Sequence, residues 1–277
     1  YKFMQFYFLL KNNLMDIVDA IILGIIQGLT EFLPVSSSGH LEIGREVLNA
    51  DLLAAENLLF TIVLHFATAL STIIIFKDDI VELLRGSISN SINGNHKYLF
   101  KIIISMIPAV LIGLFFEKEI EILFTGNITL VGSMLIITGI LLLLTKISKE
   151  KKGVISYYHS FIIGISQAFA IIPGISRSGA TICTSLLLGN NKKQSAKFSF
   201  LMVIPLIFGK IIKDLCSNNI AFNNIDYIVY IFGFISAFIT GLFACKLMLK
   251  IVKNNNLNIF SGYCIILGLI SIIITSL

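Results

Sequence analysis

The chain has 277 residues, of which 56% are hydrophobic and 13% are charged, and its formal net charge is +5. A mean hydropathy of +0.91 excludes an ordinary water-soluble domain, because so few charges cannot cover a surface of this size. The positive charge would suit nucleic-acid binding in a soluble protein, but the basic residues gather at the ends of apolar segments, as orientation in a bilayer requires. We therefore expect an integral membrane protein with no nucleic-acid partner.

Apolar segments of about 18 residues recur along the whole chain, and each is long enough to cross about 30 Å of hydrocarbon. Six are predicted to be simple transmembrane helices: 58–76, 99–116, 128–145, 198–215, 227–249 and 258–277. Two others, 17–44 and 157–189, are interrupted by proline and by runs of glycine and serine. Residues 1–15 have no small-residue cleavage site and are expected to form an N-terminal extension.

The charges of the loops predict the course of the second interrupted segment. Loops 77–101, 146–156 and 190–197 carry clusters of lysine or arginine, so we expect them to face the cytoplasm. Because 146–156 and 190–197 lie on the same side, segment 157–189 must enter and leave the membrane there. It is predicted to be a re-entrant hairpin.

An internal repeat relates the two interrupted segments. The sequence GIIQ that ends at Gln27 matches GISQ that ends at Gln167, at an offset of 140 residues. The same offset pairs three residues of the first segment with three of the second: Ser36 with Ser176, Ser38 with Ser178, and Gly39 with Gly179.

A repeat with copies in opposite orientation is typical of membrane transporters, in which broken helices meet near the midplane. We therefore expect 17–44 to be a second hairpin that enters from outside. The predicted fold is an all-α polytopic membrane protein with six transmembrane helices and two re-entrant helical hairpins in an inverted-topology repeat. A single membrane domain, 16–277, would contain repeat one at about 16–145 and repeat two at about 157–277.

The first interruption reads QGLTEFLPVSSSGH from Gln27 to His40. Gln27 and Glu31 are four residues apart, so on a helix they point to one face. A carboxylate within an apolar span is costly, which favours a functional role for Glu31. Pro34 ends the helix, and hydroxyl groups follow. His40 comes three residues after Ser37, and a serine near an imidazole is the nucleophile–base pair of covalent catalysis.

The second interruption reads PGISRSGAT from Pro173 to Thr181. Arg177 is the only arginine within an apolar stretch, and its fork of donors among small hydroxyl residues suits a phosphate group. A helix that restarts near Gly179 would add free backbone N–H groups to such an anion site.

Structural explanations stay open for each of these residues. Serine and threonine in membrane helices often bond to their own backbone, and glycine often marks close helix packing. An ion pair between Glu31 and Arg177 could serve architecture alone. His65 lies within a predicted transmembrane helix, where a lone histidine is more often a satisfied interior residue than a ligand.

The two motifs resemble the signature motifs of bacterial undecaprenyl-diphosphate phosphatases, the BacA-type family linked to bacitracin resistance. The resemblance runs from about Asp19 to the C-terminus. It implies a fold with six membrane-spanning helices and two re-entrant helical pairs in inverted repeat. It also implies hydrolysis of undecaprenyl diphosphate to undecaprenyl phosphate and phosphate, which recycles the lipid carrier for peptidoglycan synthesis.

Matching positions imply the site. The resemblance makes Glu31, His40 and Arg177 catalytic and Ser37 the nucleophile, whereas substrate or phosphate contacts fall to Gln27, Ser36, Ser38, Ser176, Arg177, Ser178 and Thr181. The family often has glutamate at the first motif position, where this chain has Gln27. An amide is a poorer ligand than a carboxylate for a hard cation, which weakens any model with two metal-binding carboxylates. The expected cofactor is a divalent cation, Mg²⁺ or Ca²⁺, with Glu31 as its ligand.

The expected mechanism is in-line attack by Ser37 on the terminal phosphorus. In it His40 is the base, Arg177 neutralises charge, and Glu31 orients His40 or a cation. Attack by water, activated by His40 or by a Glu31-bound cation, is the alternative.

Two rival functions are compatible with an inverted repeat of broken helices: a transporter or flippase for polyprenyl phosphates, and a catalytically inactive lipid-binding protein. A transporter has no need of a paired Ser37 and His40. The expected location is the bacterial cytoplasmic (inner) membrane, with the active site on the extracytoplasmic side. The expected partners are the bilayer and the lipid substrate undecaprenyl diphosphate, which bacitracin sequesters. A homodimer, with a second copy of the chain, is also expected.

Overall fold

The computed structural model describes residues 15–48, 50, 54–88, 94–124, 126–148, 153–216, 226–253 and 257–276. The regular elements in these ranges are all helices, and the ranges contain no β-strand. The predicted extension at 1–15 lies outside the described residues, apart from Met15.

Six long helices are apolar enough to cross a membrane, which confirms the predicted number of spans. They are α4 (Ala54–Ile75), α6 (Gly94–Phe115), α8 (Ile128–Leu144), α11 (Lys192–Cys216), α12 (Tyr227–Lys253) and α13 (Asn258–Ser276). Helices α6, α11 and α12 begin or end beyond the predicted apolar limits, because backbone hydrogen bonding continues through the polar residues at the ends of a span. Two short helices connect long ones, α5 (Lys77–Ser87) between α4 and α6 and α7 (Glu117–Leu123) between α6 and α8, and the 3₁₀ turn η1 (Thr145–Ile147) follows α8.

Both interrupted segments are pairs of short helices, as the sequence predicts. The first pair is α2 (Ile17–Phe32) and α3 (Ser37–Leu48), and the second is α9 (Tyr157–Phe169) and α10 (Arg177–Leu187). The longest of the four has 16 residues, about 24 Å at 1.5 Å per residue, so none spans the hydrocarbon alone. That each pair returns to the side from which it enters stays a prediction.

The breaks follow from local chemistry. Helix α2 ends at Phe32, and Leu33, the residue before Pro34, has the extended backbone that a following proline favours. In the second break Gly174 has φ +97°, a conformation that glycine adopts without steric cost. The next helices start with serine caps: Ser36 Oγ accepts from Gly39 N at 3.3 Å, and Ser176 Oγ accepts from Gly179 N at 3.0 Å.

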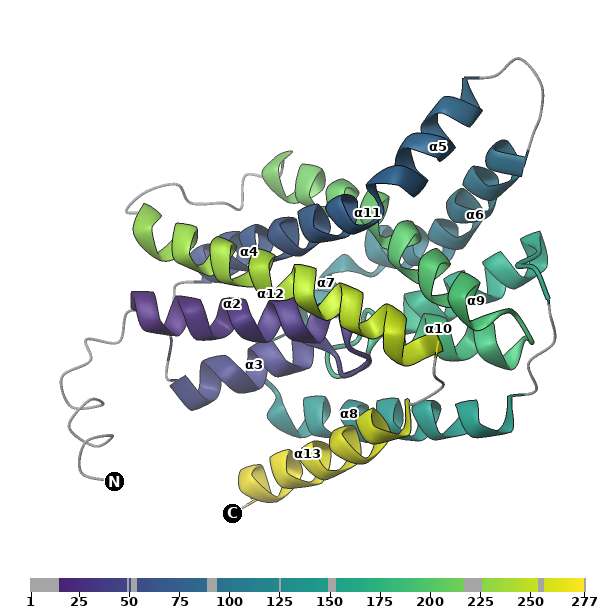
Figure 1. The fold of residues 1–277 in the computed structure, drawn as a ribbon. Coiled ribbons are helices and arrows are strands. Elements are labelled where there is room, and N and C mark those ends of the chain that lie inside the picture. Colours follow the sequence, from purple (N-terminus) through teal and green to yellow (C-terminus); the bar gives the residue numbers. More distant parts are fainter. Residues whose placement is uncertain are drawn as a thin grey trace.

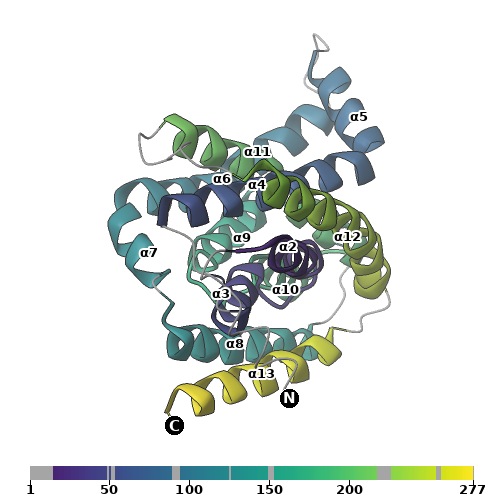
Figure 2. The ribbon, with the colours of Figure 1, turned by 90° about the vertical axis from the view of Figure 1, so that its left-hand side faces the viewer.

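The four short helices lie inside a ring of long ones, as the end-on view shows (Figure 2). Helix α2 packs along α12, and α9 packs along α6, so each short pair contacts a long helix from the other half of the chain (Figure 1). Glycines make these contacts close. A Cβ on Gly28 would lie 2.5 Å from Ala237 O, and one on Gly164 would lie 2.4 Å from Ser105 O. The exact division into repeats at 16–145 and 157–277 stays a prediction.

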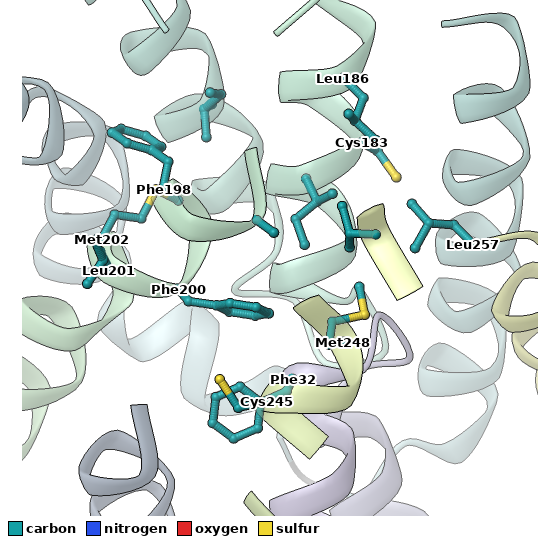
Figure 3. Close-up of a cluster of buried hydrophobic side chains, with 14 of the residues drawn as sticks. Phe32, Cys183, Leu186, Phe198, Phe200, Leu201, Met202, Cys245, Met248 and Leu257 are labelled. Atoms are coloured by element: carbon teal, nitrogen blue, oxygen red, sulfur yellow. The ribbon is translucent and has the colours of Figure 1, made fainter. Parts of the chain in front are cut away.

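A buried apolar cluster holds the end of α2 against α10, α11 and α12 (Figure 3). Phe32 and Phe200 meet edge to face with ring centroids 5.6 Å apart, and both side chains are almost fully buried. Cys183, Cys245 and Met248 belong to the same cluster. Because Phe32 is the last residue of α2, this packing fixes the position at which the first break begins.

Replacing Gly28 by alanine is expected to lower the free energy of unfolding by about 1–3 kcal/mol, because the new methyl group would push α2 away from α12. Thermal unfolding in detergent measures the effect. Gly113→Ala in α6 is the control, since nothing lies within 4 Å of its Cβ position and alanine favours a helix. Equal unfolding temperatures for the two variants would contradict the close contact.

Candidate active site

The two breaks meet at one carboxylate, Glu31, whose residue is 7% exposed. Ser37, the first residue of α3, donates its hydroxyl to Glu31 Oε2 at 2.8 Å. Arg177, the first residue of α10, donates from its guanidinium to Glu31 Oε1. Ser37 and Arg177 are equivalent positions at the 140-residue offset. The start of a helix from each half therefore faces the same acid, and the two interruptions come together.

This arrangement offsets the cost of a buried charge. An ionised carboxylate in an apolar interior needs charged or hydrogen-bonding partners, and Glu31 has both kinds. The starts of α3 and α10 also contribute partial positive charge from their free backbone N–H groups. A phosphate group that entered here would meet the same hydroxyl, guanidinium and helix starts.

Gln27 and His65 complete the cluster around Glu31. Gln27 Nε2 donates to Glu31 Oε2 at 3.0 Å, as the spacing of four residues predicts, and lies 3.1 Å from His65 Nδ1. His65 Nδ1 is 3.6 Å from Glu31 Oε2. Our sequence interpretation left His65 without a role. The rule that singled out Glu31, that an ionisable residue within an apolar span is functional by default, would also have found this histidine.

His40 has partners other than Ser37. Its Nδ1 lies 2.7 Å from Ser36 O, its Nε2 lies 2.8 Å from Tyr263 Oη, and its ring stacks on that tyrosine. No hydrogen bond joins Ser37 to His40 in the described part of the chain, so the expected nucleophile–base contact is not made. The imidazole is directed instead toward Tyr263 of α13.

The other residues predicted to contact phosphate, the serines of the two turns and Thr181, bond to groups other than Glu31. Ser36 and Ser176 are caps, and each Oγ also lies 3.3 Å from the Oγ two residues on, that of Ser38 or Ser178. Thr181 bonds to the backbone of its own helix, at Arg177 O, and to Ser199 Oγ at 2.7 Å. These hydroxyls support the two turns, whereas Gln27, Ser37 and Arg177 reach Glu31.

The donors around Glu31 do not fit a divalent cation held by the protein. One of its oxygens already accepts from the Arg177 guanidinium, and the other accepts from Ser37 and Gln27. Within the described ranges no group of three or more histidine, cysteine, aspartate or glutamate side chains is placed to bind a metal. The cation expected from the sequence stays a prediction.

Fold and site together define the class: a multi-pass membrane protein in which a buried carboxylate, a guanidinium and a serine hydroxyl meet between two broken helical pairs. Residues 20–270 match the family described as bacitracin resistance protein BacA. The chain belongs to this family.

Similar proteins occur in bacteria and archaea. The chain is 56% identical over 259 residues to the undecaprenyl-diphosphatase of Christiangramia forsetii, which covers 94% of this chain and 98% of the relative. It is 45% identical over 267 residues to the undecaprenyl-diphosphatase of Bacteroides fragilis, and the match covers 95% of this chain and 100% of the relative. It is 42% identical over 250 residues to the undecaprenyl-diphosphatase of Methanococcus maripaludis, and the match covers 89% of this chain and 96% of the relative.

Replacing Glu31 by glutamine is expected to lower the free energy of unfolding by about 3 kcal/mol, because the partly buried Arg177 guanidinium would lose its counter-charge. Thermal unfolding in detergent measures the change. Combining Glu31→Gln with Arg177→Met should restore much of the loss, since no unpaired charge remains.

The matched control is Glu117→Gln, which removes the carboxylate of a more exposed ion pair with Lys213. Its cost is expected to stay below about 1 kcal/mol. A double variant as unstable as Glu31→Gln alone would show that the pair does not act as a unit.

Proposed function

We propose that this protein hydrolyses undecaprenyl diphosphate to undecaprenyl phosphate and inorganic phosphate. Membership of the BacA family and relatives of nearly full length named undecaprenyl-diphosphatase support this activity. The observation that carries it within this chain is the hydroxyl of Ser37, which donates to Glu31 beside the Arg177 guanidinium. A nucleophile, a proton acceptor and an anion-binding group are thus in one place.

In the first step Ser37 Oγ attacks the terminal phosphorus, and its proton passes to Glu31 Oε2. The bond between that phosphorus and the bridging oxygen breaks, so undecaprenyl phosphate leaves with the bonding electrons. Arg177 stabilises the charge that develops on the phosphoryl oxygens. In the second step water attacks the phosphoserine, and Ser37 recovers its proton from Glu31. The product phosphate keeps the oxygen and both protons of the water.

Glu31 replaces His40 as the proposed base because a base must lie within hydrogen-bond reach of the proton that it accepts. Ser37 Oγ is 2.8 Å from Glu31 Oε2, whereas both ring nitrogens of His40 have other partners. His40 then acts on the first turn of α3, where its contacts with Ser36 O and Tyr263 hold the start of that helix.

The lipid part of the substrate is proposed to lie along the apolar outer faces of the long helices, within the bilayer. We place the protein in the bacterial cytoplasmic membrane with the site open to the extracytoplasmic side, on the basis of the loop charges. A divalent cation, where one takes part, would be held mainly by the diphosphate oxygens. Recycling of the lipid carrier would lower the free substrate that bacitracin sequesters and so confer resistance. A homodimer stays a prediction.

The direct test is release of phosphate from undecaprenyl diphosphate by the purified protein in detergent. Ser37→Ala is expected to lower turnover at least about 100-fold, because it removes the proposed nucleophile. Substrate labelled in its terminal phosphate should leave label on Ser37 of the unaltered protein when the reaction is quenched.

Ser133→Ala is the matched control, since this half-buried serine of α8 donates to Thr129 O in its own helix. It should keep full turnover. Substantial turnover by Ser37→Ala, with no label on the protein, would favour water as nucleophile. Movement of the lipid carrier across liposomes without phosphate release would favour the transporter.

A further inference from the structure

We infer that His65 is a positioning residue, whose unprotonated Nδ1 accepts a hydrogen bond from the Gln27 amide and so keeps that amide turned toward Glu31. The effect on turnover rests on the proposed function, but the protonation state of His65 does not. His65 lies on α4 and Gln27 on α2, so the contact joins a long helix to the first short pair.

The orientation of the Gln27 amide follows from its surroundings. Nε2 lies 3.0 Å from Glu31 Oε2, and Oε1 is buried without a hydrogen-bond partner. Exchange of the two atoms would place a carbonyl oxygen against the carboxylate, where both groups are acceptors. It would also bury two N–H bonds at a position that offers them no partner. The NH₂ group therefore faces Glu31.

That orientation determines the tautomer of His65. Nε2 carries two hydrogens and has two neighbours within hydrogen-bond distance, Glu31 Oε2 at 3.0 Å and His65 Nδ1 at 3.1 Å. Only a ring nitrogen without a proton can accept this bond, so the neutral imidazole must carry its proton on Nε2. The same nitrogen lies 3.6 Å from Glu31 Oε2. His65 therefore interacts with this carboxylate through the Gln27 amide that lies between them.

The second half of the chain contains an equivalent glutamine whose amide donates to a different acceptor. Gln167, equivalent to Gln27 at the 140-residue offset, donates from Nε2 to Ser105 O at 3.4 Å, and its Oε1 is likewise buried without a partner. Position 205, equivalent to His65, is proline. In both halves a glutamine has its NH₂ group held by an acceptor on a neighbouring long helix. Ser105 O can only accept, which is the role inferred for His65 Nδ1.

Loss of this acceptor would leave the Gln27 amide with one hydrogen bond in place of two. The amide could then rotate away from Glu31, and the oxygen that receives the Ser37 proton would lose one of its two donors. Because Ser37 and Gln27 share Glu31 Oε2, the geometry between nucleophile and base depends on this contact.

Two substitutions separate the acceptor from the ring. His65→Asn can place its amide oxygen where Nδ1 now lies, whereas His65→Phe keeps a ring of similar size with no acceptor. We expect kcat for phosphate release to fall about tenfold in His65→Phe with KM little changed, and to stay within about threefold of the unaltered protein in His65→Asn. Phe66→Leu is the control, because Phe66 faces Phe208 and Phe234.

Equal losses in His65→Asn and His65→Phe would overturn the inference, since they would indicate a proton carrier or a packing role. Full activity in both would overturn it as well. A second measurement is the ¹⁵N spectrum of histidine-labelled protein at neutral pH, with the His65 signals identified by their loss in His65→Asn. We expect an unprotonated Nδ1 and a protonated Nε2, and the opposite tautomer or a doubly protonated ring would contradict the inference.

The spectrum is independent of catalysis and is taken on the unaltered chain. If the unaltered protein released no phosphate, the proposed function would fail while the spectrum still decided the state of His65. If His65→Phe did not fold, the spectrum together with the activity of His65→Asn would decide.

Discussion

The structure depends on how one carboxylate is accommodated inside an apolar bundle. Glu31 lies near the end of α2, where little water is available to solvate a charge, and an unpaired ion there would cost several kcal/mol. Its partners come from four helices: Gln27 from its own, Ser37 from α3, Arg177 from α10, and through the amide His65 from α4. The requirement to satisfy one acid therefore couples segments that are far apart in the chain.

The broken helices create a second requirement, because their backbone groups also lie among apolar neighbours. Irregular backbone at such a depth is tolerated where protein surrounds it. Thr138 of α8 meets this need at the second break, accepting from Ser176 N at 3.0 Å and donating to Gly174 O at 2.9 Å. Ser178 links the two breaks by donating to Leu33 O. The surrounding ring of long helices thus completes hydrogen bonding that the short helices cannot complete alone.

The two halves share a scaffold and differ in chemistry. The serine caps, the glutamine and one close glycine contact, that of Gly24 in the first half and Gly164 in the second, recur at the 140-residue offset. At the reactive positions the halves diverge: Glu31 corresponds to Ile171, Ser37 to Arg177, and His40 to Ala180. Under the proposed function, proton transfer is concentrated in the first half and anion binding in the second, so that a complete site requires both.

The sequence by itself determined the membrane class, the six spans and the two breaks, and it singled out Glu31, Ser37 and Arg177 as candidates. These features depend on segment length, on proline and glycine, and on the cost of charge in hydrocarbon, all of which are local properties. Only the tertiary structure decided which side chains touch. In the folded chain Ser37 bonds to Glu31 and not to His40, His40 lies against Tyr263, and His65 lies against Gln27. Such contacts depend on the rotation of each helix and on the packing of distant helices, which spacing along one chain does not specify.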